Sequence, residues 1–347
     1  MEITSLLRCQ VKALNLRKHS FTLPTSFYIL ITTDLAIAKQ ALIADEIIAI
    51  PTETVYGLAG NAYSETAIKK IFTLKKRPFY NPLIVHIKSA AFLPQVACDI
   101  PAIAEKMARE FWPGPLTLIL KKQPNIPDLV TAGKETVAIR VPNHPTTLSL
   151  LAQLDFPLAA PSANPFGSIS PTSAEHVASY FKATLDVVLD GGECEKGLES
   201  TIIGFENDQP VLFRLGAISV EDIEKIIGKV RVRTSVSDTD VTAPGMLSRH
   251  YSPATNTHLT DNVREYMKSF ENKKIGLLLF KDAVKDNNLT HQEILSPSGD
   301  LVEAARALYA ALHRLDKLDL DVIIAERFPD SGLGKTINDR LQRAVEK

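Results

Sequence analysis

Cysteine and long apolar runs are what this 347-residue sequence has least of. Its three cysteines, Cys9, Cys98 and Cys194, are odd in number and far apart. This arrangement fits neither a disulfide framework nor the paired spacing of a zinc site. No stretch approaches the ~20 consecutive apolar residues that a membrane-spanning helix needs. We therefore expect a protein of the reducing cytoplasm that has no membrane span and no protein-bound metal.

Net charge is also nearly absent, at a formal value of -1. Charged residues make up 23% of the chain and hydrophobic residues 45%, which is typical of a folded globular protein. A strongly basic nucleic-acid-binding protein is excluded, so any contact with nucleic acid must be local. The chain is longer than a single hydrophobic core usually grows, which favours two domains. We interpret residues 1–24 as an N-terminal extension without a secretory signal, and an organelle-targeting segment is the alternative.

From residue 34 to about 228, helical periodicity alternates with short apolar runs, which predicts a mixed α/β domain. Helices are expected at 34–44, 64–76, 102–111, 146–154, 173–181 and 220–227, and strands at 47–50, 83–87, 116–120, 137–141, 157–160, 187–189, 201–204 and 211–214. Residues 230–242 are rich in polar residues and predict a linker or an edge strand. A strand at 275–280, a helix at 300–315, a strand at 322–325 and a final helix from about 337 then predict a small βαβ-type domain.

Two polar segments directly follow apolar strands. The first is Pro51-Thr52-Glu53-Thr54-Val55-Tyr56-Gly57-Leu58, and the second is Pro161-Ser162-Ala163-Asn164. Open α/β sheets commonly bind ligands at the ends of strands, so these hydroxyls, carboxylate and amide are candidates for a site. The alternative is that the same groups only cap turns of the backbone.

Several cationic residues are candidates for binding anions. Lys75 and Arg77 lie in Leu74-Lys75-Lys76-Arg77-Pro78, which closes a helix. They can complement the helix dipole or bind phosphates and carboxylates. Arg140 interrupts an apolar strand and needs an anionic partner, and because no acidic residue is close in sequence, we expect a ligand carboxylate to fill that role. His86, on another apolar strand, is by itself typical of a core histidine.

Six ordered blocks carry a family resemblance. They are Lys75-x-Arg77, Ser162-x-Asn164, residues 51–58, Asn81-Pro82-Leu83, Trp112-Pro113-Gly114-Pro115 and Gly197-Leu198-Glu199-Ser200-Thr201. Together they resemble the YrdC-type threonylcarbamoyl-AMP synthases over residues 30 to 230. Pro244-Gly245-Met246 and Arg249-His250-Tyr251-Ser252-Pro253 extend the resemblance to the long, two-domain form of the family. Leu198 and Leu215 depart from the family pattern and affect the expected loop shape only.

The resemblance implies an α/β fold with a YrdC-like twisted mixed sheet, a large concave positive cavity and a smaller C-terminal Rossmann-like α/β domain. The limits that we expect are 1–24 for the extension, 25–229 for the catalytic domain, 230–256 for a linker that closes over the cavity as a lid, and 257–347 for the C-terminal domain.

The activity that the resemblance implies is synthesis of threonylcarbamoyl-AMP and pyrophosphate from L-threonine, bicarbonate or CO2, and ATP. The product would pass to a tRNA threonylcarbamoyl transferase complex that makes t6A next to the anticodon. Mg2+ would be carried on the phosphates rather than in a cage of protein ligands. A double-stranded RNA-binding or ribosome-maturation protein of the same fold is the alternative, and weak RNA binding is compatible with either. Related carbamoyl-transfer enzymes carry zinc fingers, for which this chain lacks paired cysteines.

The resemblance also implies roles for individual residues by matching position. The family's proposed catalytic set falls on Lys75, Arg77, Ser162 and Asn164. ATP-binding positions fall on Arg77, Asn81, Thr136, Ser162, Ser170, Arg214 and Tyr251, and threonine-binding positions fall on Thr54, His86, Arg140, Ala160 and Ser200.

A second phosphate-binding motif is suggested by Gly332-Leu333-Gly334-Lys335-Thr336, which ends like a P-loop. Pro329 stands where the first glycine of that motif belongs. We therefore interpret the segment as a glycine-rich turn that leads into the last helix.

Overall fold

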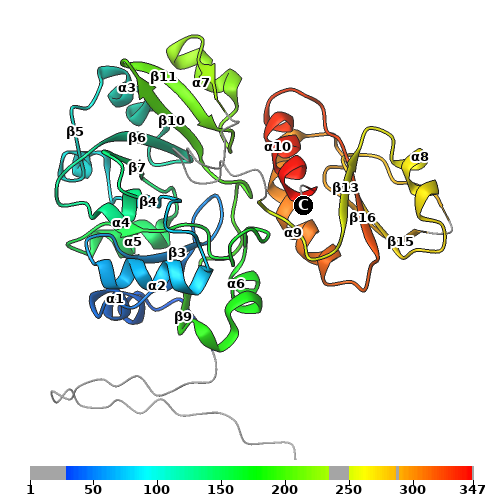
Figure 1. The fold of residues 1–347 in the computed structure, drawn as a ribbon, viewed down its shortest axis with the longest axis horizontal. Coiled ribbons are helices and arrows are strands. Elements are labelled where there is room, and N and C mark those ends of the chain that lie inside the picture. Colours follow the sequence, from blue (N-terminus) through cyan, green and yellow to red (C-terminus); the bar gives the residue numbers. More distant parts are fainter. Residues whose placement is uncertain (1–28, 234–249, 287–288, 346–347) are drawn as a thin grey trace, which may run out of the picture.

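The structure is a computed structural model that describes residues 29–233, 250–286 and 289–345 (Figure 1). The expected extension at 1–24, residues 244–246 and 249 of the linker blocks, and Cys9 lie outside the described residues. The described chain forms two sheets, which confirms a mixed α/β fold with a separate C-terminal α/β domain.

The larger sheet has twelve strands and mixes parallel with antiparallel pairs. Its order is β1-β9-β2-β3-β8-β4-β7-β6-β10-β11-β12, and β5 pairs with β6 at the side. The strands are β1 (Leu30–Thr32), β2 (Ile48–Ile50), β3 (Gly57–Asn61), β4 (Ile84–His86), β5 (Ala97–Cys98), β6 (Leu116–Lys122), β7 (Thr136–Arg140), β8 (Leu158–Ala159), β9 (Val187–Leu189), β10 (Thr201–Glu206), β11 (Gln209–Arg214) and β12 (Arg231–Val232).

Seven α-helices belong to the part of the larger domain that the structure describes. They are α1 (Leu35–Ile43), α2 (Glu65–Lys75), α3 (Ala102–Phe111), α4 (Asp128–Thr131), α5 (Pro145–Ala152), α6 (Ala174–Phe181) and α7 (Val220–Ile227), and 3-10 turns cover Ala90–Gln95 and Lys182–Thr184. Side-chain caps start four of the helices, because Asp34, Ser64, Ser173 and Ser219 each accept a hydrogen bond from a backbone N–H of the first turn.

Strand pairing brings the candidate segments to one place. β4 pairs in parallel with β7 so that His86 lies opposite Arg140, at the end of both strands. Residues 51–56 follow β2, residues 160–164 follow β8, and a bridge joins Gly57 to Ser162. The polar segments that follow these strands therefore lie close to one another.

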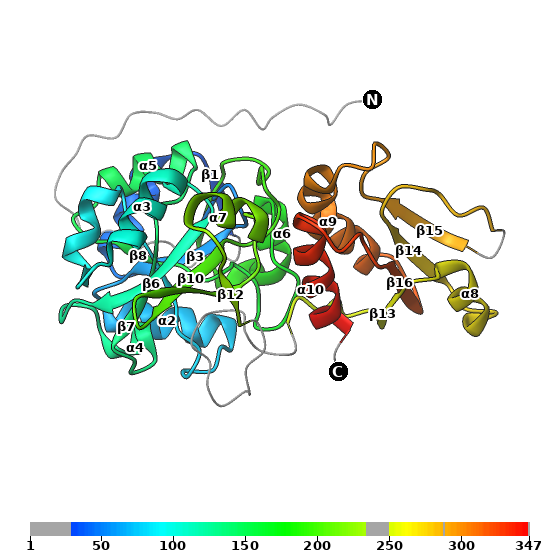
Figure 2. The same ribbon diagram turned by 90° about the horizontal axis from the view of Figure 1, so that it is seen from above.

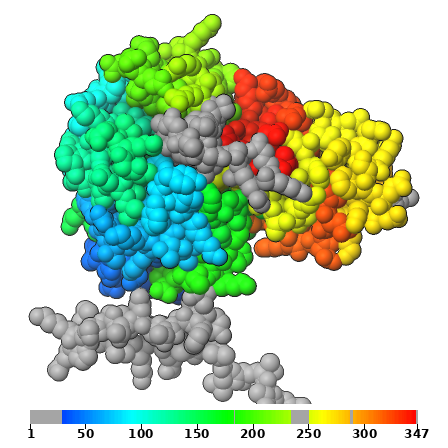
Figure 3. Space-filling model, in the orientation of Figure 1, coloured from blue at the N-terminus to red at the C-terminus, as the bar shows by residue number. Residues whose placement is uncertain are grey.

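The C-terminal domain has a four-stranded parallel sheet in the order β13-β16-β14-β15. Its elements are β13 (Thr257–Thr260), α8 (Val263–Met267), a 3-10 turn (Lys268–Phe270), β14 (Ile275–Leu279), β15 (Leu289–Ile294), α9 (Leu301–Asp316), β16 (Val322–Glu326) and α10 (Leu333–Val345). Helices α9 and α10 lie between this sheet and the larger domain (Figure 2). In the space-filling view the surface of α10, in red, adjoins that of the larger domain (Figure 3).

The expected helices and strands are present, and several differences are informative. Residues 57–58 start β3 instead of continuing a loop, and β1, β13 and β15 were not expected. The last helix begins at Leu333, four residues before the expected start, because Gly332, with φ of +50°, completes the turn directly before it. The P-loop-like segment is therefore helical from its second residue, and its Lys335 pairs with Glu221 of α7 at 2.7 Å.

An interdomain cluster of apolar side chains joins the two domains. Val55, Ile169 and Leu198 of the larger domain pack in the same buried cluster as Leu308 and Leu312 of α9. Leu198 is fully buried there, so this departure from the family pattern has a packing role. The two domains share a continuous hydrophobic core.

The approach of the domains is close at Gly197, whose φ is +68°. A Cβ atom at this position would lie 2.4 Å from the backbone oxygen of Arg306 in α9. Gly192 has a similar φ of +80°, but a Cβ there would meet nothing within 4 Å. A comparison of substitutions at these two glycines therefore distinguishes the effect of backbone strain from the effect of interdomain contact.

We expect Gly197→Ala to lower the thermal midpoint of unfolding more than Gly192→Ala does. Each substitution imposes roughly 1–2 kcal/mol of strain from positive φ, and only Gly197→Ala adds the clash with α9. Calorimetry of both variants measures the difference. Equal midpoints would mean that the domains separate at this point without loss of stability.

Candidate active site

A cavity that is partly open to solvent lies where the strand ends meet. Its lining comes from seven segments of the larger domain and from the linker, and comprises Thr52, Thr54, Val55, Gly57, Arg77, Ile84, His86, Arg140, Ala160, Pro161, Ser162, Glu199, Ser200, Arg214, His250 and Tyr251. Nine residues predicted from the sequence line this cavity, namely Thr54, Arg77, His86, Arg140, Ala160, Ser162, Ser200, Arg214 and Tyr251. The remaining predicted residues lie behind its wall or away from it.

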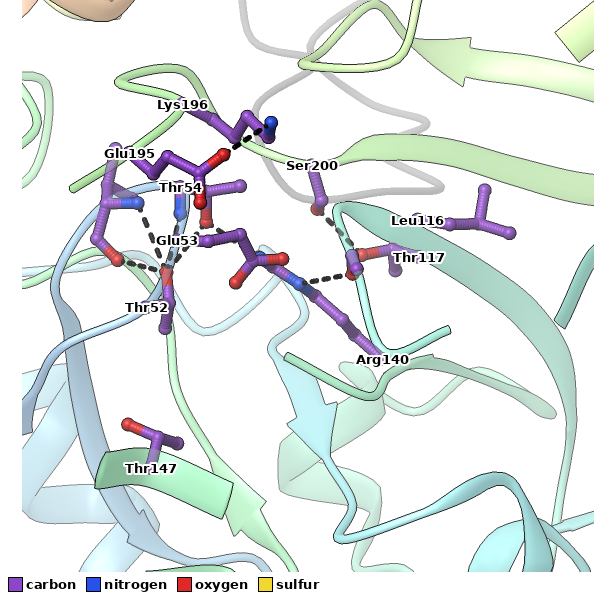
Figure 4. Close-up of polar contacts among 12 residues, drawn as sticks. Thr52, Glu53, Thr54, Leu116, Thr117, Arg140, Thr147, Glu195, Lys196 and Ser200 are labelled. Atoms are coloured by element: carbon purple, nitrogen blue, oxygen red, sulfur yellow. Dashed lines mark hydrogen bonds and ion pairs between the residues drawn. The ribbon is translucent and has the colours of Figure 1, made fainter. Parts of the chain in front are cut away.

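The segment after β2 is held rigid by hydroxyl groups. The Thr52 hydroxyl donates to the Val55 carbonyl at 2.6 Å and accepts from the backbone N–H groups of Thr54 and Val55 at 3.1 and 3.2 Å. Thr147 of α5 donates to the carbonyl of Pro51. These contacts turn the Thr54 hydroxyl toward Arg140, Thr117 and Ser200 (Figure 4).

Arg140 has a partner within the protein, which corrects the expectation that only a ligand could supply one. Its guanidinium lies 2.7 Å from a carboxylate oxygen of Glu53, and both side chains are almost fully buried. It also donates to the Thr54 hydroxyl at 2.8 Å and to the Gly114 carbonyl at 3.2 Å. The partner was missed because Glu53 is distant in sequence, although it belongs to one of the quoted motif blocks.

The ion pair between Glu53 and Arg140 is close but not fully hydrogen-bonded. Neither carboxylate oxygen of Glu53 has a hydrogen-bond partner among the described residues, and the Nη2 atom of Arg140 has none either. Charge and proximity therefore hold this ion pair, while the directed hydrogen bonds of Arg140 go to Thr54 and Gly114.

Arg214 and Ser200 form a second polar group at the cavity. Arg214, at the end of β11, donates to the Ser200 carbonyl at 2.8 Å and to the Ser200 hydroxyl at 2.9 Å. The Ser200 hydroxyl also lies 2.7 Å from that of Thr117 in β6. Ser200 is thus fixed between two strands, next to the Arg140 group (Figure 4).

Arg77 faces the cavity, whereas the neighbouring Lys75 does not line it. Arg77 donates to the Asn81 side-chain oxygen at 2.6 Å and to the Pro82 carbonyl at 2.8 Å, and burial lowers its pKa to about 9. Lys75 donates to the backbone carbonyls of Ser162, at 2.5 Å, and Asn164. Burial and the charge of Arg77 hold the pKa of Lys75 well below its usual value. Lys75 thus supports the loop that carries Ser162.

Four other predicted residues lie outside the lining. Asn81 orients Arg77, and Asn164 donates to the carbonyls of its own loop. Ser170 is buried behind the wall, where its hydroxyl donates to Glu199 at 2.6 Å. Thr136 starts β7 at the end opposite to Arg140, roughly 13 Å away along the strand, and does not reach the cavity.

His86 is neutral at the cavity wall. Burial, and then the charge of Arg140, lower its pKa to about 3. Its Nδ1 atom lies 3.3 Å from the Ile84 carbonyl and can only donate there, so Nε2 is left as a hydrogen-bond acceptor. His86 therefore adds a neutral acceptor to the cationic donors of the cavity.

The linker contributes His250 and Tyr251, and the strand-end motif contributes Glu199. Tyr251 is 1% exposed and adopts a φ of +64°. Its hydroxyl and the Nδ1 atom of His250 have no hydrogen-bond partner among the described residues. Glu199 and His250 were quoted in the motifs but not predicted as site residues. The signal available in the sequence was an ionisable side chain inside a motif block.

Within residues 29–233, 250–286 and 289–345, no group of three or more His, Cys, Asp or Glu side chains could hold a metal ion. Over the same residues, no helix is long and apolar enough to cross a membrane.

The fold and the polar cavity define a YrdC-type α/β domain joined to a second α/β domain, and comparisons with known proteins agree. Residues 40–216 match a family model described as telomere recombination. Residues 218–345 match the model of the threonylcarbamoyl-AMP synthase C-terminal domain. Together the two models account for most of the chain.

Curated relatives give the same result. The threonylcarbamoyl-AMP synthase of Pyrococcus abyssi is 40% identical over 89% of this chain and 93% of its own. That of Bacillus subtilis is 39% identical over 90% of this chain and 94% of its own. A crystal structure of the P. abyssi protein in complex with L-threonine superimposes with a TM-score of 0.84 at 41% identity, and covers 90% of this chain and 94% of that one.

The chain belongs to the threonylcarbamoyl-AMP synthase family, in its long form with both domains. It is an enzyme that makes threonylcarbamoyl-AMP, with ATP as a substrate, for t6A modification of tRNA. This decides between the two functions that the sequence left open, in favour of the synthase over the RNA-binding protein.

The two buried histidines of the cavity make stability depend on pH. Burial lowers the pKa of His86 and of His250 to about 3, against 6.5 for an unperturbed histidine. Between these values the unfolded chain binds protons that the folded chain does not, so the free energy of unfolding falls as the pH falls. The loss at pH 5 is roughly 2 kcal/mol for each histidine.

We expect urea unfolding to yield a smaller free energy at pH 5 than at pH 7. His86→Gln removes one of the two groups and should shrink the difference by roughly 2 kcal/mol. A pH-independent free energy of unfolding would contradict the buried, neutral state of these histidines.

Proposed function

We propose that the cavity binds L-threonine beside the Arg140 group and ATP beside Arg77 and Arg214. The observation that carries this proposal is the pairing of β4 with β7, which puts the neutral acceptor His86 next to Arg140. A zwitterionic amino acid needs both kinds of partner, because Arg140 and Ser200 donate to its carboxylate while His86 Nε2 accepts a hydrogen bond from its amine or hydroxyl group. Thr54 and Ala160 complete this half of the cavity.

ATP occupies the other half in this proposal. Arg77, Arg214, Ser162 and Tyr251 line it, and two arginines there suit a triphosphate because guanidinium groups bind phosphate oxygens in pairs. Lys75, Asn81, Asn164 and Ser170 act from behind, by holding Ser162, Arg77 and Glu199 in position. Thr136 is the least supported member of the ATP set, because it lies at the far end of β7. In this assignment the cavity is the concave, positively lined site of the family.

The chemistry follows from these groups. The amine of threonine attacks CO2 derived from bicarbonate and gives a carbamate, with loss of the amine proton. A carbamate oxygen then attacks the α-phosphorus of ATP, and pyrophosphate leaves. Such a reaction needs positioning and charge neutralisation more than an activated nucleophile of the protein. The arginines of the cavity supply both functions.

Magnesium fits this scheme as a ligand of the phosphates. Glu199, the carboxylate that lines the cavity, is already engaged by Ser170, Tyr309 and Arg340 and offers no vacant pair of oxygens. Oxygens of the triphosphate and water are the ligands that Mg2+ prefers in nucleotide sites. We therefore assign the ion to the nucleotide, where it would neutralise developing charge on the phosphates.

The wider setting is proposed on the same basis. The linker expected at 230–256 contributes His250 and Tyr251, which line the cavity and act as a lid over it. It separates a catalytic domain at 25–229 from a C-terminal domain at 257–347. The product passes in the cytoplasm to a transferase complex that acts on tRNA, with weak RNA contacts at most.

The test of the proposed reaction is pyrophosphate release by the full chain with ATP and Mg2+. We expect release to require both threonine and bicarbonate, because the carbamate is the nucleophile. A mass spectrum of the product should show threonylcarbamoyl-AMP. Equal release in buffer freed of CO2 would contradict the mechanism.

We expect loss of Arg140 to weaken threonine binding in particular. Removing a charged hydrogen-bond donor costs about 1.5–3 kcal/mol, so the KM for threonine should rise by about tenfold or more. The substitution is best made as Arg140→Ala with Glu53→Gln, since Arg140→Ala alone leaves a buried unpaired charge. Glu53→Gln alone is the matched control, because it keeps the donor. A raised KM for ATP with an unchanged KM for threonine would reverse the assignment.

A further inference from the structure

A carboxylate lies in the wall of a cavity that is otherwise suited to anions. Glu199 is 6% exposed and lines the cavity together with Arg77, Arg140 and Arg214. An unneutralised negative charge at this position would repel the triphosphate of ATP and would offset part of the attraction of the arginines. The way in which the protein neutralises Glu199 therefore bears on nucleotide binding.

The C-terminal domain supplies a large part of the neutralisation of Glu199. Arg340 of α10 donates to a carboxylate oxygen of Glu199 at 2.9 Å, and the Tyr309 hydroxyl of α9 contacts both oxygens at 2.9 and 3.0 Å. Burial alone would raise the pKa of Glu199, but the charges of Arg340 and Arg214 and the Ser170 hydroxyl hold it at about 2. The carboxylate is thus ionised and fully occupied.

Arg340 also holds two other parts of the cavity wall. It donates to the carbonyl of Leu215, the residue after Arg214, at 2.6 Å. Its guanidinium carbon lies 4.8 Å from the centre of the Tyr251 ring, within range of a cation–π contact. The side chain is 1% exposed. One residue of α10 therefore touches three elements that bound the proposed ATP half.

A second interdomain ion pair provides the comparison. Lys335, also on α10, pairs with Glu221 of α7 at 2.7 Å, but both side chains are partly exposed and neither lines the cavity. If the ion pairs of α10 served only to join the domains, loss of Arg340 and loss of Lys335 would both change the stability of the protein and nothing else. Of these two residues, Arg340 contacts the cavity wall and Lys335 does not, so we expect only the loss of Arg340 to affect ligand binding.

We propose that Arg340 of the C-terminal domain is a positioning residue for ATP, which neutralises Glu199 and holds Tyr251 and the backbone beside Arg214. The inference rests on the proposed binding of ATP in this cavity. It assigns a part in the reaction to the C-terminal domain, whose sheet is remote from the chemistry. Arg340 itself touches no substrate in this scheme and acts through Glu199, Leu215 and Tyr251.

The experiment measures ATP binding by calorimetry, in the presence of Mg2+, for the full chain and four variants. These are Arg340→Met, Glu199→Gln, the double variant with both substitutions, and Lys335→Met as the matched control. KM values for ATP and threonine and the thermal midpoint of unfolding are measured in parallel. The double variant distinguishes a role of Arg340 in ATP binding from a role in stability, because it removes both charges of the pair and leaves no buried unpaired carboxylate.

For Arg340→Met we expect the Kd for ATP to rise by about tenfold or more, with the KM for threonine changed by less than about threefold. The double variant should return the Kd to within about threefold of Glu199→Gln, and Lys335→Met should match the wild type. A role in stability alone predicts lowered thermal midpoints with no selective change in the Kd for ATP.

A Kd for ATP in Arg340→Met that stays near the wild-type value would overturn the inference, as would a folded double variant that binds ATP as weakly as Arg340→Met. If Arg340→Met does not fold, the double variant and Arg340→Lys test the inference instead. The double variant lacks the charges of both Glu199 and Arg340, and Arg340→Lys keeps a negative charge at 199 and a positive charge at 340. Both must then bind ATP within about threefold of the wild type. Wild-type protein that binds no ATP would instead refute the proposed function, and the inference with it.

Discussion

The parallel pairing of β4 with β7 is the constraint on which the rest of the site depends. It sets His86 beside Arg140 at the ends of two buried strands, and it brings Arg140 within reach of the turn after β2. Glu53 then locks the guanidinium in place, and Thr54 connects it to that turn. A slip of one residue in this register would turn one of the two side chains to the opposite face of the sheet, and His86 and Arg140 would no longer meet at the cavity.

The buried cationic side chains of this protein each have oxygen partners close by. The cavity gathers three arginines in a chain whose formal net charge is -1. Arg140 is held by Glu53, and Arg77 by neutral oxygens of Asn81 and Pro82. Cations can be buried at such density because each has oxygen partners that recover part of the lost hydration. Three arginines can thereby line one cavity without making the whole surface attractive to nucleic acid.

Sequence patterns predicted the strand ends and the segments that follow them, because apolar runs delimit buried strands and the motif residues come directly after. They did not reveal the partner of Arg140, which depends on strand register between distant segments. The sequence also did not show which way the Lys75 side chain points, since a lysine at a helix end can turn toward a cavity or toward backbone carbonyls. Strands β13 and β15 were missed because edge strands carry mixed polar residues and lack a continuous apolar run.

The cluster formed by Val55, Ile169 and Leu198 with Leu308 and Leu312 has an evolutionary consequence. Because the two domains share one core, a change of side-chain volume on either side must be met by a change on the other, as in the interior of a single domain. The two halves of the gene are therefore not free to drift separately or to be exchanged between distant relatives. Among relatives, substitutions in α9 should be correlated with substitutions around residue 198, although the two regions are far apart in the sequence.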